Sequence, residues 1–99
     1  MTERFTSKSF SDQLHTTFHV HVPEIGTLPL ELIEVTEFTD QPNVEQFCLI
    51  FRGPREPWFQ QKTRALEHEA LGKMDLFMAP LGPDKEGMRY QVIFNRFRK

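Results

Sequence analysis

Histidines alternate with apolar residues near the start of the chain, and their spacing is the closest this sequence comes to a metal site. His19 and His21 stand two residues apart in TFHVHV (17–22), and His15 and His68 supply further imidazoles. Side chains two apart on a strand share one face, so His19 and His21 could reach one ion. Zinc sites use three or four protein ligands, however, and any alternating polar face produces this spacing. We therefore expect surface histidines and no metal site.

Acidic residues in two short runs raise the question of acid–base catalysis. Glu31, Glu34 and Glu37 form the first run, and Glu67 and Glu69 form the second. Strand alternation turns Glu31 and Glu37 outward, and solvated carboxylates are poor general acids at neutral pH. The sequence also lacks a nucleophile elbow, a phosphate-binding loop, a CxxC pair and an HExxH motif. We therefore expect a protein that is not an enzyme and that uses no cofactor.

The segment PREPWF (54–59) places the only tryptophan beside a phenylalanine, an arginine and two prolines. An exposed Trp58 next to Arg55 would be typical of a protein–protein hot spot. Alternatively, Trp58 or Phe59 folds back and fills one end of a barrel, because large aromatic rings are seldom left in water. We favour the filling role, since a small core needs the apolar area. Arg55, Trp58 and Phe59, together with His68, are our candidate binding residues.

The length and composition predict one domain over residues 1–99. The chain is 38% hydrophobic and 26% charged, and its ten phenylalanines help a small core reach stability. We expect a flexible arm at 1–6, a short helix at 7–14 with serine caps, and a β-domain over 17–99.

Two-residue alternation of apolar side chains dominates the β-domain. The run 30–38 changes phase near Ile33, which predicts a β-bulge, and the run 47–52 is apolar on both faces, which predicts a central strand. Residues 62–71 fit a helix by composition and a strand by pattern. The sequence thus predicts an all-β, mainly antiparallel fold of about six strands, a meander that closes into a small barrel or forms a two-layer sheet. The expected strands and turn regions are 17–22, 30–38, 47–52, 62–71, 74–79 and 89–97, with turns at 23–29, 39–46, 53–60 and 80–87.

Charge and cysteine content indicate the compartment and exclude some partners. Twelve basic and fourteen acidic residues are interspersed, so no nucleic-acid partner is expected, and the basic end 96–99 is read as a solvated terminus. The single Cys48 excludes an internal disulfide; we expect it to be a small buried hydrophobe in a reducing compartment. The N-terminal residues lack the apolar stretch of a signal peptide, and no segment reaches membrane-spanning length. We expect a cytoplasmic protein with no membrane partner.

The chain contains the segments FCLIFRGP (47–54), LEHEALG (66–72), LFMAPLGP (76–83) and YQVIFNR (90–96). Together they resemble a family of small bacterial β-rich domains of unknown function. The resemblance implies a strand and a turn for 66–72, although Glu69 stands where the family is expected to have a proline. It implies no activity. It also implies that such domains are similar in setting to accessory proteins encoded near phage-tail-like or fibre proteins.

These features lead to two functional hypotheses. The first is a non-enzymatic protein–protein interaction or accessory module that binds a protein partner, or a second copy of itself, through a sheet edge or the 54–60 loop. The alternative is a small-ligand or carbohydrate-binding barrel whose mouth is lined by Arg55, Trp58 and His68.

Overall fold

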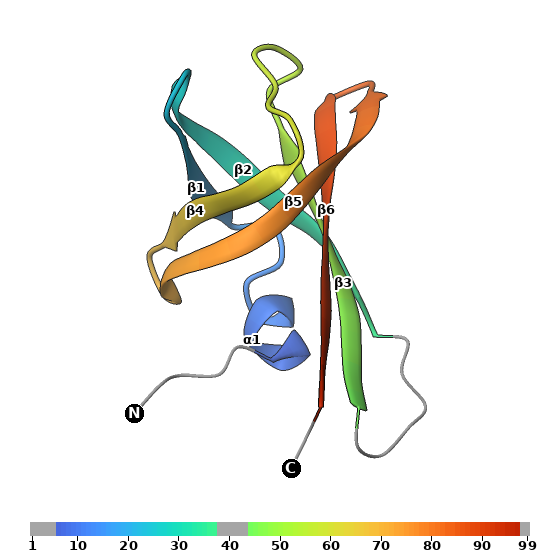
Figure 1. The fold of residues 1–99 in the computed structure, drawn as a ribbon. Coiled ribbons are helices and arrows are strands. Elements are labelled where there is room, and N and C mark those ends of the chain that lie inside the picture. Colours follow the sequence, from blue (N-terminus) through green and yellow to red (C-terminus); the bar gives the residue numbers. More distant parts are fainter. Residues whose placement is uncertain (1–5, 38–43, 98–99) are drawn as a thin grey trace.

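The computed structural model describes residues 6–37 and 44–97, which form one short helix and six antiparallel strands (Figure 1). The strands close into a barrel in the order β1-β2-β3-β6-β5-β4. The elements are α1 (Ser7–Ser11), β1 (Thr17–Val22), β2 (Gly26–Glu37), β3 (Val44–Gly53), β4 (Lys62–His68), β5 (Gly72–Asp84) and β6 (Gly87–Phe97).

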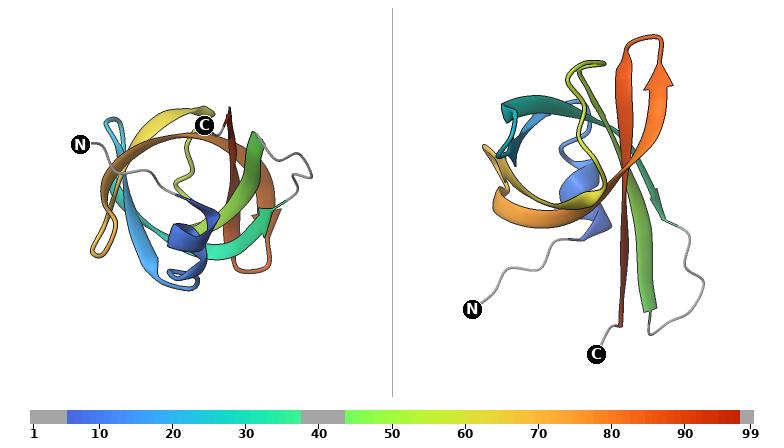
Figure 2. Two further views of the ribbon diagram at one scale, coloured as in Figure 1. Left: turned by 90° about the horizontal axis from the view of Figure 1, so that it is seen from below. Right: turned by 45° about the horizontal axis from the view of Figure 1, so that its top comes forward.

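The predicted all-β antiparallel barrel is confirmed, but the predicted meander is wrong, because β3 does not pair with the next strand along the chain. Neighbours follow the chain from β1 to β3, but β3 then pairs with β6, and β4 closes the barrel against β1. The segment 54–61 therefore carries the chain across one end of the barrel, from β3 to β4 (Figure 2). This crossing segment contains the only tryptophan.

The alternation predicted for the first strand is confirmed, as is the bulge. Phe18, Val20 and Val22 are buried, whereas the residues between them are exposed. In β2 the register shifts between Leu32 and Glu34, as the change of phase near Ile33 predicted. The strand β3 lies between β2 and β6.

Several predicted boundaries were wrong, mostly where prolines occur. Pro29 was placed in a turn, but it lies in β2 opposite His19. The ladder from β2 to β3 begins only at Glu31, so a residue without an N–H is tolerated in this singly paired part of the strand. Likewise β5 continues from 79 to 84, where it has only β6 beside it and where a register shift accommodates Pro80 and Gly82. The turn expected over 80–87 shrinks to residues 85–86.

Three further expectations are resolved. The ambiguous segment 62–71 is a strand that ends at His68, followed by a turn. The helix expected over 7–14 ends at Ser11, with Thr6 and Ser9 forming a capping box at its start. Cys48 is partly exposed rather than buried, because even-numbered positions of β3 face outward. Residues 1–5 of the expected arm lie outside the described residues.

The described residues share one hydrophobic cluster, and α1 closes one end of it (Figure 1). Phe10 of α1 is fully buried, and its ring centroid lies 5.5 Å from that of Phe94 and 6.1 Å from that of Phe47. Among the described residues, no helix is long and apolar enough to cross a membrane.

Candidate functional site

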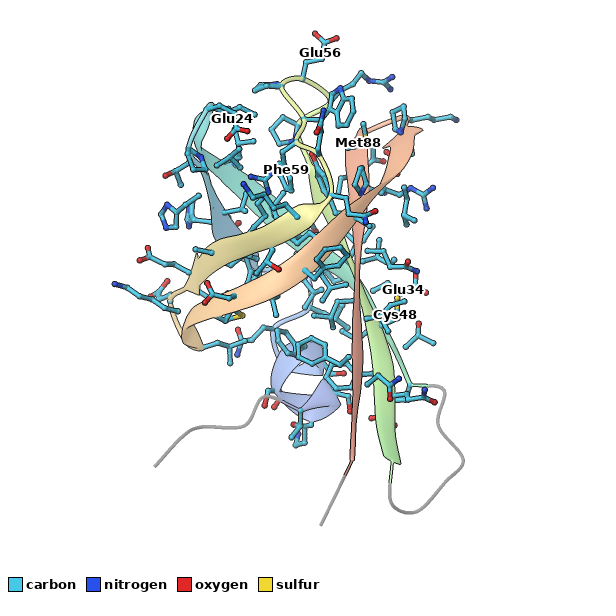
Figure 3. The ribbon with its side chains drawn as sticks, viewed as in Figure 1. Glu24, Glu34, Cys48, Glu56, Phe59 and Met88 are labelled. Atoms are coloured by element: carbon cyan, nitrogen blue, oxygen red, sulfur yellow. The ribbon has the colours of Figure 1, made fainter. Side chains whose placement is uncertain are left out.

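Two adjacent aromatic residues of the crossing loop 54–61 differ sharply in exposure to solvent. Phe59 is 2% exposed, whereas Trp58 is 47% exposed. Figure 3 shows Glu56 at the outer tip of this loop and Phe59 below it, toward the barrel. The filling role considered for Trp58 or Phe59 thus falls to Phe59, and Trp58 stays in solvent.

Phe59 is held by a stack against β6. Its ring lies 4.1 Å from that of Tyr90, with 5° between the two planes. The backbone N–H of Phe59 donates to Tyr90 Oη at 3.2 Å. Burial raises the pKa of Tyr90, which keeps the hydroxyl protonated in the working pH range. The stack and the hydrogen bond together fix the chain immediately after Trp58.

Arg64 covers the face of the Phe59 ring that Tyr90 leaves open, and its role was not predicted from the sequence. Arg64 is only 4% exposed, and its guanidinium carbon lies 5.1 Å from the centre of the Phe59 ring. Its Nη2 donates to the backbone oxygen of Gln60 at 3.0 Å, and its Nε is buried without a partner. No carboxylate in the described part of the chain forms an ion pair with it. Alternation back from buried Leu66 would have identified Arg64 as inward-facing, had residues 62–71 been assigned to a strand.

Arg55 anchors the other side of the loop. Its Nη2 donates to the backbone oxygen of Asp84, at the tip of the hairpin between β5 and β6. The carboxylate of Asp84 binds Arg52 Nη2 at 2.7 Å and accepts from the backbone N–H groups of Glu86 and Gly87. The hydrogen bond from Arg52, together with that from the Glu86 N–H, lowers the pKa of Asp84 to about 2. The loop therefore rests on a hairpin whose tip is itself tied by several polar contacts.

These contacts leave one large side chain of the loop uncommitted to the barrel. Trp58 lines a shallow hollow with Glu56 and Pro57, between the anchors at Arg55 and Phe59. An aromatic side chain on an already ordered loop loses less conformational entropy on binding than one on a free segment. The arrangement is suited to presenting an indole ring to a partner.

His68 lies apart from this loop, at the opposite end of β4. Its Nδ1 accepts from the N–H groups of Ala70 and Leu71 at 3.0 and 3.2 Å, so the proton of the neutral ring is on Nε2. That Nε2 donates to Thr16 Oγ1 at 2.8 Å. Burial lowers the pKa of His68, which favours the neutral ring. Since both ring nitrogens are used, His68 holds the turn after β4 against the segment before β1, and it does not join Arg55, Trp58 and Phe59 in one site.

A groove of about 930 Å³ lies beside His68, between the start of β1 and the turn after β4. His19 opens onto it, and Glu67 lies 3.8 Å from Lys73 within it. His21 contacts Glu67 at 3.5 Å. In the part of the chain that the structure describes, no group of three or more His, Cys, Asp or Glu side chains is placed to hold a metal ion.

One protein-family model matches most of this chain. It belongs to the family described as a domain of unknown function, DUF6916, whose model matches residues 5–94. The resemblance to a family of β-rich domains of unknown function is thereby confirmed. No curated protein and no solved structure matches the chain. The family description assigns no activity.

Proposed function

We propose that this domain is a non-enzymatic interaction module that binds a partner protein through the loop 54–61, with Trp58 inserted into an apolar pocket of the partner. The observation that supports the proposal is a contrast within the loop: Trp58 is 47% exposed, while Arg55 before it bonds to Asp84 and Phe59 directly after it is buried and bonds to Tyr90. Tryptophan is the residue type most enriched among interface hot spots.

The barrel keeps this aromatic ring in water although its core would gain from covering it. Burying a large aromatic side chain contributes roughly 1.5–3 kcal/mol. Phe59 already occupies the barrel end with its stack on Tyr90, so the indole of Trp58 has no place in the core. Its apolar area is available to a partner, and the anchored loop lowers the entropic cost of using it.

We propose that the domain acts in the bacterial cytoplasm as an accessory factor. The family resemblance implies a setting near phage-tail-like or fibre proteins. A component of such an assembly is therefore the first partner to test. Such assemblies bring many protein surfaces together, which suits a small interaction module.

Site-specific photo-crosslinking tests this proposal in cells of the native host. A benzophenone amino acid replaces Trp58 in one variant and Thr27, an exposed residue in β2, in a matched control. We expect a crosslinked partner at position 58 that is absent at position 27. The isolated partner should then bind the Trp58→Ala variant about 30-fold more weakly than the unmodified domain, since truncating a hot-spot residue costs about 2 kcal/mol.

Two results would contradict the proposal. One is equal crosslinking at positions 58 and 27. The other is an unchanged affinity of Trp58→Ala for the captured partner, with both proteins folded by circular dichroism.

A small-ligand function is the second candidate, and the groove of about 930 Å³ beside His68 is the observation that favours it. The barrel mouth first considered for this role is filled by Phe59, and α1 with Phe10 closes the other end of the core. A polar ligand bound in the groove would raise the melting temperature of the domain, and Lys73→Ala would remove that rise. A thermal-shift screen of sugars and small polar metabolites measures both.

A further inference from the structure

The shallow hollow beside Trp58 contains a carboxylate as well as an aromatic ring. Its lining consists of Glu56, Pro57 and Trp58. Figure 3 shows Glu56 at the outer tip of the loop, with its side chain directed away from the barrel. Glu56 forms no ion pair with any residue that the structure describes. Its negative charge is therefore open to a positive charge on a partner.

The groups that line the hollow are suited to a cation rather than to an anion. The face of an indole ring is electrostatically negative and attracts cations. Pro57 has no backbone N–H, so it adds no hydrogen-bond donor of the kind that an anion requires. The carboxylate of Glu56 is the only formal charge among the three lining residues. The ring and the carboxylate thus favour the same sign of charge in an occupant.

The arginine that precedes Glu56 in the chain is used elsewhere. Arg55 donates to the backbone oxygen of Asp84 on the neighbouring hairpin, and it does not line the hollow. Within the described part of the chain, Glu56 has no ion pair with Arg55 or with any other cation. The carboxylate beside Trp58 is therefore left for a cation from outside the domain.

We propose that the partner contributes an arginine, which stacks on the indole of Trp58 and pairs with the carboxylate of Glu56. This inference rests on the proposed function and names the chemistry of its partner: the pocket that receives Trp58 carries this arginine at its rim. A guanidinium is planar, so it lies against an aromatic ring while its N–H groups donate to a carboxylate. An ammonium group is compact and more strongly hydrated, so a lysine fits the same place less well.

A second copy of this chain is a poor source of the arginine. Arg64 is buried in its own barrel. Three other arginines with described side chains contact Asp84 of their own chain: Arg52, Arg55 and Arg89. One of these contacts would have to break before its guanidinium could stack on the indole of another copy. The occupant that fits better is a different protein with an exposed arginine.

Selection from a displayed library of random twelve-residue peptides tests this inference on the purified domain. Peptides that also bind Trp58→Ala are removed first, so that the peptides kept depend on the indole. We expect arginine to be enriched among the kept peptides, and lysine to be enriched less.

A charge reversal then tests the role of the carboxylate. Glu56→Lys should bind the arginine-containing peptides about fivefold more weakly and should select acidic residues in their place. Glu24→Lys is the matched control, because it makes the same charge change at an exposed carboxylate at the same end of the barrel, in the turn between β1 and β2 (Figure 3). It should leave the selection unchanged.

Iodide quenching of the single tryptophan locates the bound peptides, which should protect Trp58. The inference is overturned if the peptides that depend on Trp58 show no excess of arginine, if Glu56→Lys selects the same arginine-rich peptides, or if no peptide depends on Trp58. A concentration-dependent dimer that protects Trp58 from iodide would also overturn it, because a second copy would then occupy the hollow. Failure of the proposed function is a separate result, namely equal crosslinking at positions 58 and 27 in the native host.

Discussion

The Phe59 and Tyr90 rings are parallel to within 5° and their centroids are 4.1 Å apart, while the Phe59 N–H donates to the Tyr90 hydroxyl. This residue pair thereby joins the crossing loop to β6, the last strand of the chain. This pair determines which aromatic side chain of the loop is buried: because Phe59 points into the barrel, its neighbour Trp58 remains outside.

Tyr90→Phe should destabilise the domain while leaving its fold intact. The substitution keeps the ring stack but removes the acceptor of a buried backbone N–H, a loss that costs about 1–3 kcal/mol. Urea denaturation followed by circular dichroism measures the free energy of unfolding. A variant as stable as the unmodified protein would show that this hydrogen bond does not anchor the loop.

Arg64 should contribute through packing and one hydrogen bond rather than through its charge. Arg64→Ala removes the cover of Phe59 and should lower the free energy of unfolding by about 2 kcal/mol or more. Arg64→Met retains an apolar side chain of similar length and removes a buried charge without a counter-ion, so its stability should stay within about 1 kcal/mol of the unmodified protein. Chemical denaturation measures the free energy of unfolding of both variants. Equal losses in Ala and Met would indicate that the guanidinium group itself is required.

The stability of the domain should fall as the pH drops below 6.5, in part because of His68. Burial lowers the pKa of His68 below its ordinary value of 6.5, so the unfolded chain takes up a proton before the folded chain does. The unfolded state then binds more protons, and the free energy of unfolding rises with pH in this window. The contribution is present above pH 6.5 and is lost as the pH falls toward the folded-state pKa.

Two variants isolate this effect. His68→Gln should be less stable at neutral pH and should show a shallower pH dependence, whereas His19→Gln, at an exposed position, should keep the original dependence. Thermal unfolding from pH 5 to 7.5 provides the comparison. A His68→Gln curve parallel to that of the unmodified protein would contradict the assignment.

Much of the fold was predictable because apolar and polar residues alternate along a half-buried strand, so its sequence shows which side chains face the core. The alternation around Val20, the change of phase near Ile33 and the two apolar faces around Leu49 each reported a local property of one strand. The pairing of β3 with β6 and the early end of the β5–β6 ladder are properties of strands distant in sequence, which no local pattern contains. Pro29, Pro80 and Pro83 misplaced boundaries for the same reason, since they are tolerated only where a strand has one neighbour.

The candidate site was predicted in part. The loop 54–59 was singled out by its composition, but adjacent aromatic residues in a loop have no fixed phase, so the sequence could not decide between Trp58 and Phe59. His68 was assigned to the same surface because the length and direction of β4 were unknown. The geometry separates it from the loop and gives both ring nitrogens partners within the domain.

The fluorescence of the single tryptophan tests the central claim most directly, since Trp58 is the only indole in the chain. In the free domain, iodide should quench this fluorescence readily, as expected for a half-exposed ring. In the complex with the crosslinked partner, quenching should be strongly reduced and the emission should shift to shorter wavelength. An indole that iodide does not reach in the free domain, or reaches equally in the complex, would contradict the account.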